Sequence, residues 1–346
     1  MITNTTFRQH PLVRSNSNNP RTILIILATV LLTAFSWGGE AFAKDKFARV
    51  GILSFSEAEN EPRLAAVLKI LRQTLANHGW IDGKNVSYVY QSARSNPSRF
   101  SEAAKALVEL DVDVIVAGSA PALRAAYGAT RTIPIVAGDF TTDAIADGYI
   151  RSYARPGGNV TGVFLDAPEI AGKWFELLNA TIPDLSRVAV LWDPGPGAVH
   201  LKAVRNVAAS LDIELQVVEI RKPEDIETAF DVLHGEPQAV VMLPSPLIYG
   251  QSAQLARLTL KHRLPATSMA RGFAIGGGVI AYGPEIVSSW ERMAVLAAKV
   301  LSGSSPAEIP VERPEKIELV VNLRSAKLLG LTIPQLVLLR ADEIIR

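Results

Sequence analysis

The chain has 346 residues, of which 48% are hydrophobic, and it carries a formal net charge of +1. This length is sufficient for two lobes with separate cores, and the nearly balanced charge offers no basic surface for nucleic acid. Because the sequence contains no cysteine, disulfide bonds, thiolate catalysis and a lipid anchor on an N-terminal cysteine are excluded.

The N-terminus has the pattern of an export signal. Three arginines precede an apolar run over residues 22–35, and Ala41-Phe42-Ala43 follows it. The apolar run is too short to span a bilayer comfortably, and the last segment fits the small-x-small cleavage rule. We therefore expect residues 1–43 to be a signal peptide that is cleaved after Ala43, which places the mature protein in the periplasm. A retained membrane anchor is the alternative interpretation.

From residue 47 onward, short apolar runs typical of buried strands alternate with segments of helical periodicity. Strands are expected at residues 47–55, 86–90, 112–117 and 132–137, and helices at residues 62–78, 98–110 and 121–129. This alternation predicts a parallel, doubly wound sheet. In such sheets ligands bind at the carboxyl ends of the strands.

A glycine-rich segment, Arg155-Pro-Gly-Gly-Asn-Val-Thr-Gly162, separates two such series of strands and helices. Its turn residues precede a β-branched pair, as in a loop that enters a strand. We interpret the segment as the first crossing between two α/β lobes, with Gly157, Gly158 and Gly162 at the hinge. A loop inside one large sheet is the alternative.

The same alternation continues after the crossing. Strands are expected at residues 187–192, 214–220, 239–243, 265–268 and 316–323, and helices at residues 167–178, 200–211, 223–234, 249–262, 286–301 and 325–329. A second hinge is expected at Gly283, where the chain returns to the first lobe. The expected division is an N-terminal lobe over 44–158, a C-terminal lobe over 159–280 and a return to the N-terminal lobe over 281–313. The lobe that holds residues 314–346 is left open.

Small, polar and aromatic residues at the expected strand ends are the candidate ligand contacts, because a cleft of aromatics with a few polar groups suits a small, partly apolar ligand. The candidates are Ser54, Phe55, Ser56, Gly118, Ser119, Ala120, Asp139, Asp143, Trp192, Asp193, Ser245, Ser268 and Tyr282. The alternative for each aromatic residue is a place in the core of its lobe.

No motif for catalysis, metal or cofactor binding is present. The five histidines lack metal-ligand spacing, and there is no nucleophile elbow or Walker loop. We therefore predict no catalytic residue, no metal and no cofactor. Asp139, Asp143 and Asp193 have three interpretations: a cap for a turn or helix, a partner for a ligand ammonium group or, ranked below both, a general acid–base set.

Separate motifs along the mature chain carry a family resemblance. They are Gly118-Ser-Ala-Pro121, Thr132-Ile-Pro-Ile135, Ala154-Arg-Pro-Gly-Gly-Asn-Val-Thr-Gly162, Gly172-Lys-Trp174, Arg187-Val-Ala-Val-Leu191, Lys261-His-Arg-Leu-Pro265, Ala281-Tyr-Gly-Pro284 and Glu318-Leu-Val-Val-Asn-Leu323. With them the chain resembles the ABC-transporter substrate-binding proteins of the tryptophan/tyrosine type. The resemblance implies a type I periplasmic binding fold, with two Rossmann-like lobes joined by a hinge. It also implies a ligand in the interlobe cleft, with a membrane permease and an ATPase as partners.

Two departures from the family pattern leave the ligand open. Ser119 stands where the family often has threonine, and Ala144 stands where proline is common. We expect a monomeric receptor of an ABC importer for an amino acid or a small aromatic or carboxylate compound, and not an enzyme. An exported sensor that signals to a membrane partner is the first alternative, and a periplasmic enzyme ranks below it. A repressor is disfavoured because a mature chain that starts on a strand has no room for a helix-turn-helix.

Overall fold

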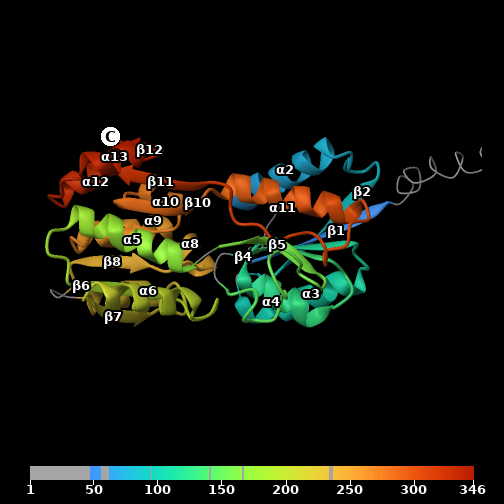
Figure 1. Cartoon of the computed structure of the whole chain (residues 1–346), viewed down its shortest axis with the longest axis horizontal. Helices are drawn as coiled ribbons and strands as arrows, with labels where there is room; N and C mark the ends of the chain where they lie inside the picture. Colours follow the sequence, from blue (N-terminus) through green and yellow to red (C-terminus); the bar gives the residue numbers. More distant parts are fainter. Residues whose placement is uncertain (1–46, 56–61, 95, 140–141, 166, 234–236) are drawn as a thin grey trace, which may run out of the picture. The chain divides into compact units, whose positions relative to one another are not determined.

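The computed structural model describes residues 47–346 apart from residues 56–61, 95, 140–141, 166 and 234–236. The expected signal peptide and the candidate Ser56 lie outside the described residues. Phe47–Arg346 form one unit in which the strands make two separate sheets (Figure 1).

The first sheet has the strand order β2-β1-β3-β4-β5, and each neighbouring pair is parallel. Its strands are β1 (Ala48–Ser54), β2 (Val86–Ser92), β3 (Val114–Ala117), β4 (Ile135–Asp139) and β5 (Val160–Phe164). Alternate side chains of β3 enter different cores, because successive residues of a strand point to opposite faces. Val114 and Val116 belong to one buried cluster, whereas Ile115 and Ala117 belong to the other.

Helices cover both faces of this sheet, as Figure 1 shows. Residues of α2 (Pro62–Asn77) and α11 (Ile286–Leu301) form the core on one face, and residues of α3 (Phe100–Glu109) and α4 (Ala120–Ala129) form the core on the other. A short 3₁₀ turn, η1 (Pro97–Arg99), precedes α3. The helix α11 thus returns to the first sheet from the far end of the sequence.

The second sheet has the order β12-β11-β10-β9-β8-β6-β7 and is parallel except for the antiparallel pair β10 and β11. Its strands are β6 (Arg187–Trp192), β7 (Glu214–Glu219), β8 (Ala239–Met242), β9 (Ala266–Ser268), β10 (Ile280–Pro284), β11 (Ile317–Asn322) and β12 (Glu343–Ile345). Two sheets of mostly parallel strands confirm the predicted α/β class.

Helices also cover the second sheet on both faces. They are α5 (Ala167–Thr181), α6 (Val199–Ser210), α7 (Asp225–Asp231), α8 (Pro246–Gly250), α9 (Ser252–Lys261), α10 (Arg271–Ile275), α12 (Leu323–Leu328) and α13 (Gln335–Arg340). Residues of α5 and α6 share a core with Val188 and Val190, whereas residues of α7, α8 and α9 share a core with Ala189 and Leu191. The alternation along β6 therefore repeats that of β3.

The chain changes sheets at places that differ from the expected boundaries. Since β5 pairs with β4, the chain leaves the first sheet after Phe164 rather than at residue 158. It leaves the second sheet after Pro284 rather than at residue 280, because β10 pairs with β9 and, as far as Pro284, with β11. The segment left open, 314–346, supplies β11 and β12 and therefore belongs to the second sheet. Pairing partners far away in the sequence decide these boundaries, and local turn signals do not reveal them.

Two of the expected hinge glycines lie inside the strands that precede these crossings. Gly162 is inside β5 and Gly283 is inside β10. Gly157 has a φ of 72° and donates its backbone N–H to the Ala307 carbonyl at 3.0 Å. Gly158, its neighbour, lies before β5. Gly157 permits a turn and Gly162 permits close strand packing, and the hinge role of the four glycines stays a prediction.

Hydrogen bonds join the crossing segments to one another. The backbone N–H of Glu312 donates to the Gly162 carbonyl at 2.9 Å, and the N–H of Phe164 donates to the Glu312 carbonyl at 2.9 Å. The N–H of Glu285 donates to the Lys316 carbonyl at 2.9 Å. The crossing over residues 312–317 is thereby tied both to the edge of the first sheet and to the start of α11.

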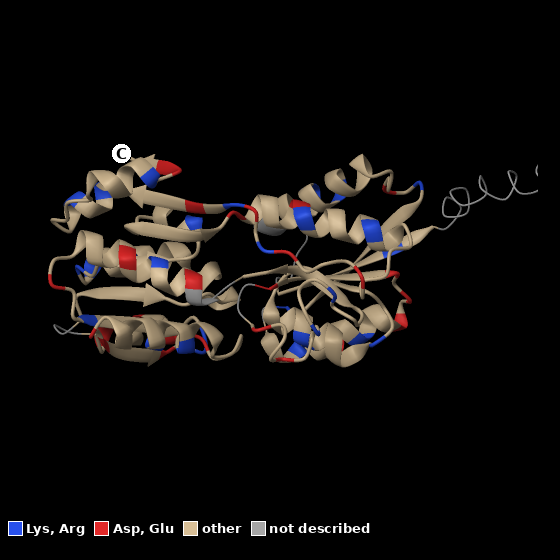
Figure 2. Cartoon of the chain, viewed as in Figure 1, with Lys and Arg blue, Asp and Glu red and all other residues tan. Residues whose placement is uncertain are grey.

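Charged residues lie mainly on helices and loops, and both signs are interspersed (Figure 2). The strands of both sheets carry few charged side chains in this view. Among the described helices, none combines the length and the apolar character that a membrane-spanning segment requires.

Candidate functional site

The carboxyl ends of the first sheet's strands bring several candidate residues to one edge. Ser54 ends β1, Gly118 and Ser119 follow β3, and Asp139 ends β4. These three strands are parallel neighbours, so their carboxyl ends share an edge. Ser54, Gly118 and Ser119 are half-buried there, and the half-buried Phe55 packs at 6.3 Å between ring centroids against a phenylalanine of α3.

The start of α4 presents small residues at this edge. Ser119 is the N-cap, and its side-chain oxygen accepts the backbone N–H of Ala122 at 3.4 Å. Ala120 is buried, and a Cβ on Gly118 would lie 2.4 Å from Cζ2 of Trp290. The glycine thus admits the indole of α11 to the end of β3, a packing role that the sequence did not reveal. Trp290, half-buried at this edge, was missed as a candidate.

Two of the candidate carboxylates are engaged by their own loop. Asp139 is fully buried, and its carboxylate accepts a short hydrogen bond from the hydroxyl of Thr142. Asp143 is exposed and accepts the backbone N–H groups of Ile145 at 3.1 Å and Ala146 at 3.0 Å. This geometry supports the capping interpretation for Asp143. Asp139 lies at the end of β4, as expected, but its side chain is removed from solvent.

The carboxyl edge of the second sheet holds Trp192, Asp193 and Ser245. The indole N–H of Trp192 donates to the Gly197 carbonyl at 3.1 Å. The half-buried Asp193 accepts the backbone N–H of Gly195 at 2.8 Å and a hydrogen bond from the buried Ser245 hydroxyl. Burial raises the pKa of the Asp193 carboxyl, and these two hydrogen bonds oppose the rise. The structure therefore joins two candidates from different strands in one polar cluster.

Ser268 and Tyr282, the last two candidates of the second sheet, contact other residues of the fold. Ser268 is 1% exposed and accepts the backbone N–H of Ala270 at 3.2 Å. Tyr282 lies within β10, and its side chain packs in the core beside α5. The indole N–H of Trp174 donates to the Tyr282 carbonyl at 2.9 Å. Tyr282 therefore occupies the position that the alternative interpretation gave to the aromatics, not a strand end.

Arg124, which the sequence analysis missed, connects the surroundings of the two edges. Its Nη1 donates to the Gly195 carbonyl at 3.2 Å and its Nη2 donates to the Pro196 carbonyl at 3.1 Å. The same side chain hydrogen-bonds to Tyr149, whose pKa is raised by burial and lowered in part by Arg124. A helix that starts at Ala120 places Arg124 one turn later, on the same side as its first residue. The spacing of four residues between Ala120 and Arg124 is the feature of the sequence that points to Arg124.

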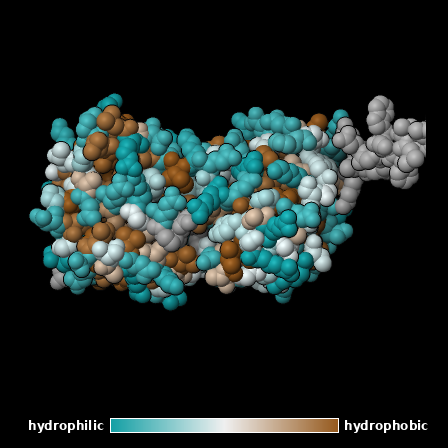
Figure 3. All heavy atoms as spheres, in the orientation of Figure 1, coloured by the Kyte–Doolittle hydropathy of each residue, from teal (hydrophilic) through white to brown (hydrophobic). Residues whose placement is uncertain are grey.

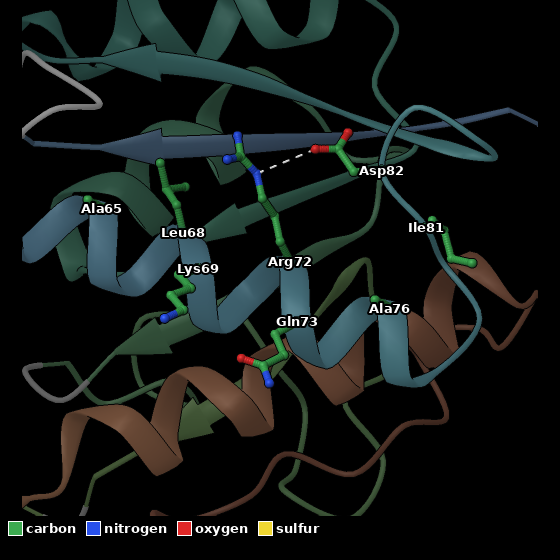
Figure 4. A pocket seen from close by; sticks show the side chains of 8 residues that line it. All are labelled: Ala65, Leu68, Lys69, Arg72, Gln73, Ala76, Ile81 and Asp82. Atoms are coloured by element: carbon green, nitrogen blue, oxygen red, sulfur yellow. Dashed lines mark ion pairs between the residues drawn. The ribbon is translucent and has the colours of Figure 1, made fainter.

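A hollow beside α2 lies away from these carboxyl edges (Figure 4). Its lining residues are Ala65, Leu68, Lys69, Arg72, Gln73, Ala76, Ile81 and Asp82. Asp82 precedes β2, so the hollow adjoins the amino end of that strand. Arg72 pairs with Asp82 at 3.7 Å, and its guanidinium lies 5.2 Å from the ring centroid of Tyr88. Burial, aided by Asp82, raises the pKa of Tyr88 to about 12. The Arg72 guanidinium is therefore engaged by two groups of the protein itself, Asp82 and Tyr88.

The histidines of the described region pack among apolar or helical groups. The ring of His200 lies 6.0 Å from that of Trp174, and the ring of His262 lies 5.5 Å from that of Phe230. Nδ1 of His78 lies 2.9 Å from a backbone carbonyl of its own helix. Within the described ranges, no group of three or more His, Cys, Asp or Glu side chains is arranged to hold a metal ion.

Comparisons with known proteins agree on this architecture. A solved structure from Vibrio cholerae, a conserved domain protein, is 26% identical with a TM-score of 0.78 and covers 86% of this chain and 100% of its own. The ABC domain of Streptococcus pneumoniae in complex with L-Trp is 22% identical, also with a TM-score of 0.78, over 86% of this chain and 99% of its own.

Sequence comparison identifies the family. The "Tyrosine-binding protein" of Clostridioides difficile (strain R20291) is 24% identical over 281 residues, which is 81% of each chain. A family model described as ABC transporter substrate binding protein matches residues 50–345. This match spans both sheets and the crossings between them. The chain therefore belongs to the family of ABC transporter substrate-binding proteins, as the motif resemblance predicted.

Proposed function

We propose that this protein is the periplasmic receptor of an ABC importer and that it holds an amino acid between the carboxyl edges of its two sheets. The observation that carries the location is the contact of Arg124 with Gly195 and Pro196. It links a helix that starts at the edge of the first sheet to the loop that follows β6. Ligands of parallel α/β sheets bind at such edges.

The chemistry of the two edges supports a zwitterionic ligand. The start of α4 offers the backbone N–H of Ala120 and the positive end of the helix dipole to a carboxylate, since Pro121 has no N–H and that of Ala122 donates to Ser119. Asp193 is the half-buried carboxylate of the opposite edge, and it suits an ammonium group. Trp192 and Trp290 supply apolar surface at the two edges. The relatives named for tyrosine and solved with L-Trp support the amino-acid class.

Membership of the family supports the proposed partners. A substrate-binding protein delivers its ligand to a membrane permease that an ATPase drives, and we propose that this chain does so as an exported monomer. Binding and release, rather than bond breaking, is the proposed role. The described carboxylates support it, because Asp143 caps its own turn and Asp139 is fully buried.

An amino-acid ligand is expected to raise the melting temperature of the protein, because it binds the folded state and not the unfolded chain. At a ligand concentration of 100 times Kd, the stabilisation is about 2.7 kcal/mol. The measurement is a thermal melting screen of the twenty standard amino acids and of small aromatic carboxylates, followed by calorimetric titration. Absence of any shift across this set would contradict the amino-acid proposal.

Arg124→Ala is expected to weaken ligand affinity by about threefold to tenfold, because it removes charge-assisted hydrogen bonds that join the two edges. The exposed position of Arg124 predicts little loss of folding stability. Arg205→Ala is the matched control, because Arg205 is an exposed arginine of α6. Equal affinities of the two variants would show that the Arg124 contact does not support binding.

A further inference from the structure

The three most exposed large hydrophobic side chains of the described residues lie close together in the sequence. Leu328 is 66% exposed, Leu336 is 75% exposed and Leu339 is 72% exposed. They belong to α12 and α13, and Figure 3 shows hydrophobic side chains gathered over these helices. We call Leu328, Leu336 and Leu339 the leucine patch. Single exposed leucines are ordinary, but Leu336 and Leu339 lie three positions apart and so share one face of α13, and adjoining exposed apolar side chains mark an interaction surface.

The elements that carry the leucine patch are anchored by other side chains. Ala326, Ile333 and Val337 are buried in the core that α12 and α13 share with β10 and β11. The patch leucines therefore contribute little to this core. They are free to enter another apolar phase without any change in the fold.

Within residues 323–340 every charged side chain is basic, whereas Asp342 and Glu343 follow directly in the sequence. Residues 323–340 contain Arg324, Lys327 and Arg340 and no aspartate or glutamate. Arg340 is paired with Glu176 at 2.7 Å. Arg324 and Lys327 are exposed, and among the described residues neither forms an ion pair. Apolar groups flanked by unpaired cations are the combination that binds the surface of an anionic bilayer.

We propose that the leucine patch, with Arg324 and Lys327, docks the protein on anionic phospholipid membranes. The leucines enter the boundary between headgroups and acyl chains, and the two cations contact lipid phosphates. A second copy of the chain fits less well, because a symmetric contact would bring cations to cations. The N-terminal segment of this chain fits poorly for the same reason, since residues 1–43 hold three arginines and one acidic residue. Docking concentrates the receptor at the membrane, where its proposed permease lies.

The test is co-sedimentation with sucrose-loaded vesicles of phosphatidylcholine and phosphatidylglycerol at a ratio of about three to one. The protein is the chain from Lys44 onward, because the described fold lies in Phe47–Arg346 and the apolar segment 22–35 would itself bind lipid. We expect binding that weakens as salt increases and that is at least about tenfold weaker on pure phosphatidylcholine.

Two variants separate the apolar and ionic contributions. Leu336→Gln/Leu339→Gln keeps residues with high helix propensity and is expected to reduce vesicle binding by about tenfold or more. Arg324→Gln/Lys327→Gln is expected to reduce it by a similar factor and to remove its salt dependence. The matched control is Leu211→Gln/Val232→Gln, because Leu211 and Val232 are 44% and 56% exposed on other elements. Circular dichroism and melting temperature confirm that each variant is folded.

Several outcomes would overturn the proposal. Failure of the wild-type chain to bind anionic vesicles would do so, and so would equal binding by the wild-type and Leu336→Gln/Leu339→Gln proteins. Concentration-dependent dimerisation that the leucine variant abolishes, in a protein that ignores vesicles, would assign the patch to a second copy instead. Ligand affinity measured in solution is expected to be unchanged in all three variants. Failure of the membrane-docking proposal is therefore distinguishable from failure of the proposed receptor function.

Discussion

Gly162→Ala is expected to destabilise the protein by about 4 kcal/mol or more, and in the extreme to prevent folding. Gly162 lies in β5 with a φ of 150°, a conformation that other residues rarely adopt. A Cβ at this position would lie 2.0 Å from the carbonyl oxygen of Ala137 and 2.7 Å from its backbone nitrogen. Both atoms are backbone of the paired strand β4, so no side-chain rearrangement relieves the overlap.

Gly158→Ala is the matched control for this substitution. Gly158 precedes the same strand, its φ is not positive, and the nearest atom to an added Cβ is 3.9 Å away. We expect an effect within about 0.5 kcal/mol for this variant. Urea unfolding followed by far-UV circular dichroism measures both free energies of unfolding. Similar unfolding midpoints for the two alanine variants would contradict the proposed overlap with β4.

Asp193→Asn is expected to weaken binding of an amino acid by about tenfold to a hundredfold, because the ligand ammonium group loses an ionised partner. The asparagine oxygen can still accept the Gly195 N–H, so the loop after β6 is expected to keep its shape. The probe is the amino acid with the largest thermal shift, titrated calorimetrically. An analogue of that ligand without the ammonium group is the control, and it should bind both proteins equally.

The same substitution is expected to raise the melting temperature of the ligand-free protein at neutral pH. Burial raises the pKa of the Asp193 carboxyl, so the folded state holds this proton more tightly than the unfolded chain does. That contribution favours folding below the unfolded pKa of about 3.9 and is lost as the pH rises through the folded value. At neutral pH the half-buried carboxylate therefore costs stability, and a neutral asparagine does not.

Melting curves between about pH 3.5 and pH 7 check this sign. The advantage of Asp193→Asn should shrink as the pH falls, because the wild-type carboxyl is then protonated in the folded state. A higher melting temperature with unchanged amino-acid affinity would remove Asp193 from the ligand site and leave it a role in the loop alone. A lower melting temperature at neutral pH would instead show that the ionised carboxylate stabilises the loop.

The sequence by itself determined the class of the fold and the family. Apolar runs such as Val114–Ala117, followed by helices with one apolar face, specify buried parallel strands because such strands are covered on both sides. The helix expected at residues 121–129 corresponds to α4, whose N-cap is Ser119. These are local signals, since they depend on residues a few positions apart.

Only the tertiary structure decided which strand joins which sheet and which candidates meet. A glycine-rich turn at residues 155–158 resembles a crossing, but the pairing of β5 with β4 keeps the chain in the first sheet until Phe164. The burial of Asp139 and the contact of Arg124 with the loop after β6 likewise depend on segments far apart in the sequence. The physical reason is that strand pairing, burial and side-chain contacts are long-range, whereas turn and helix signals reflect local backbone preferences.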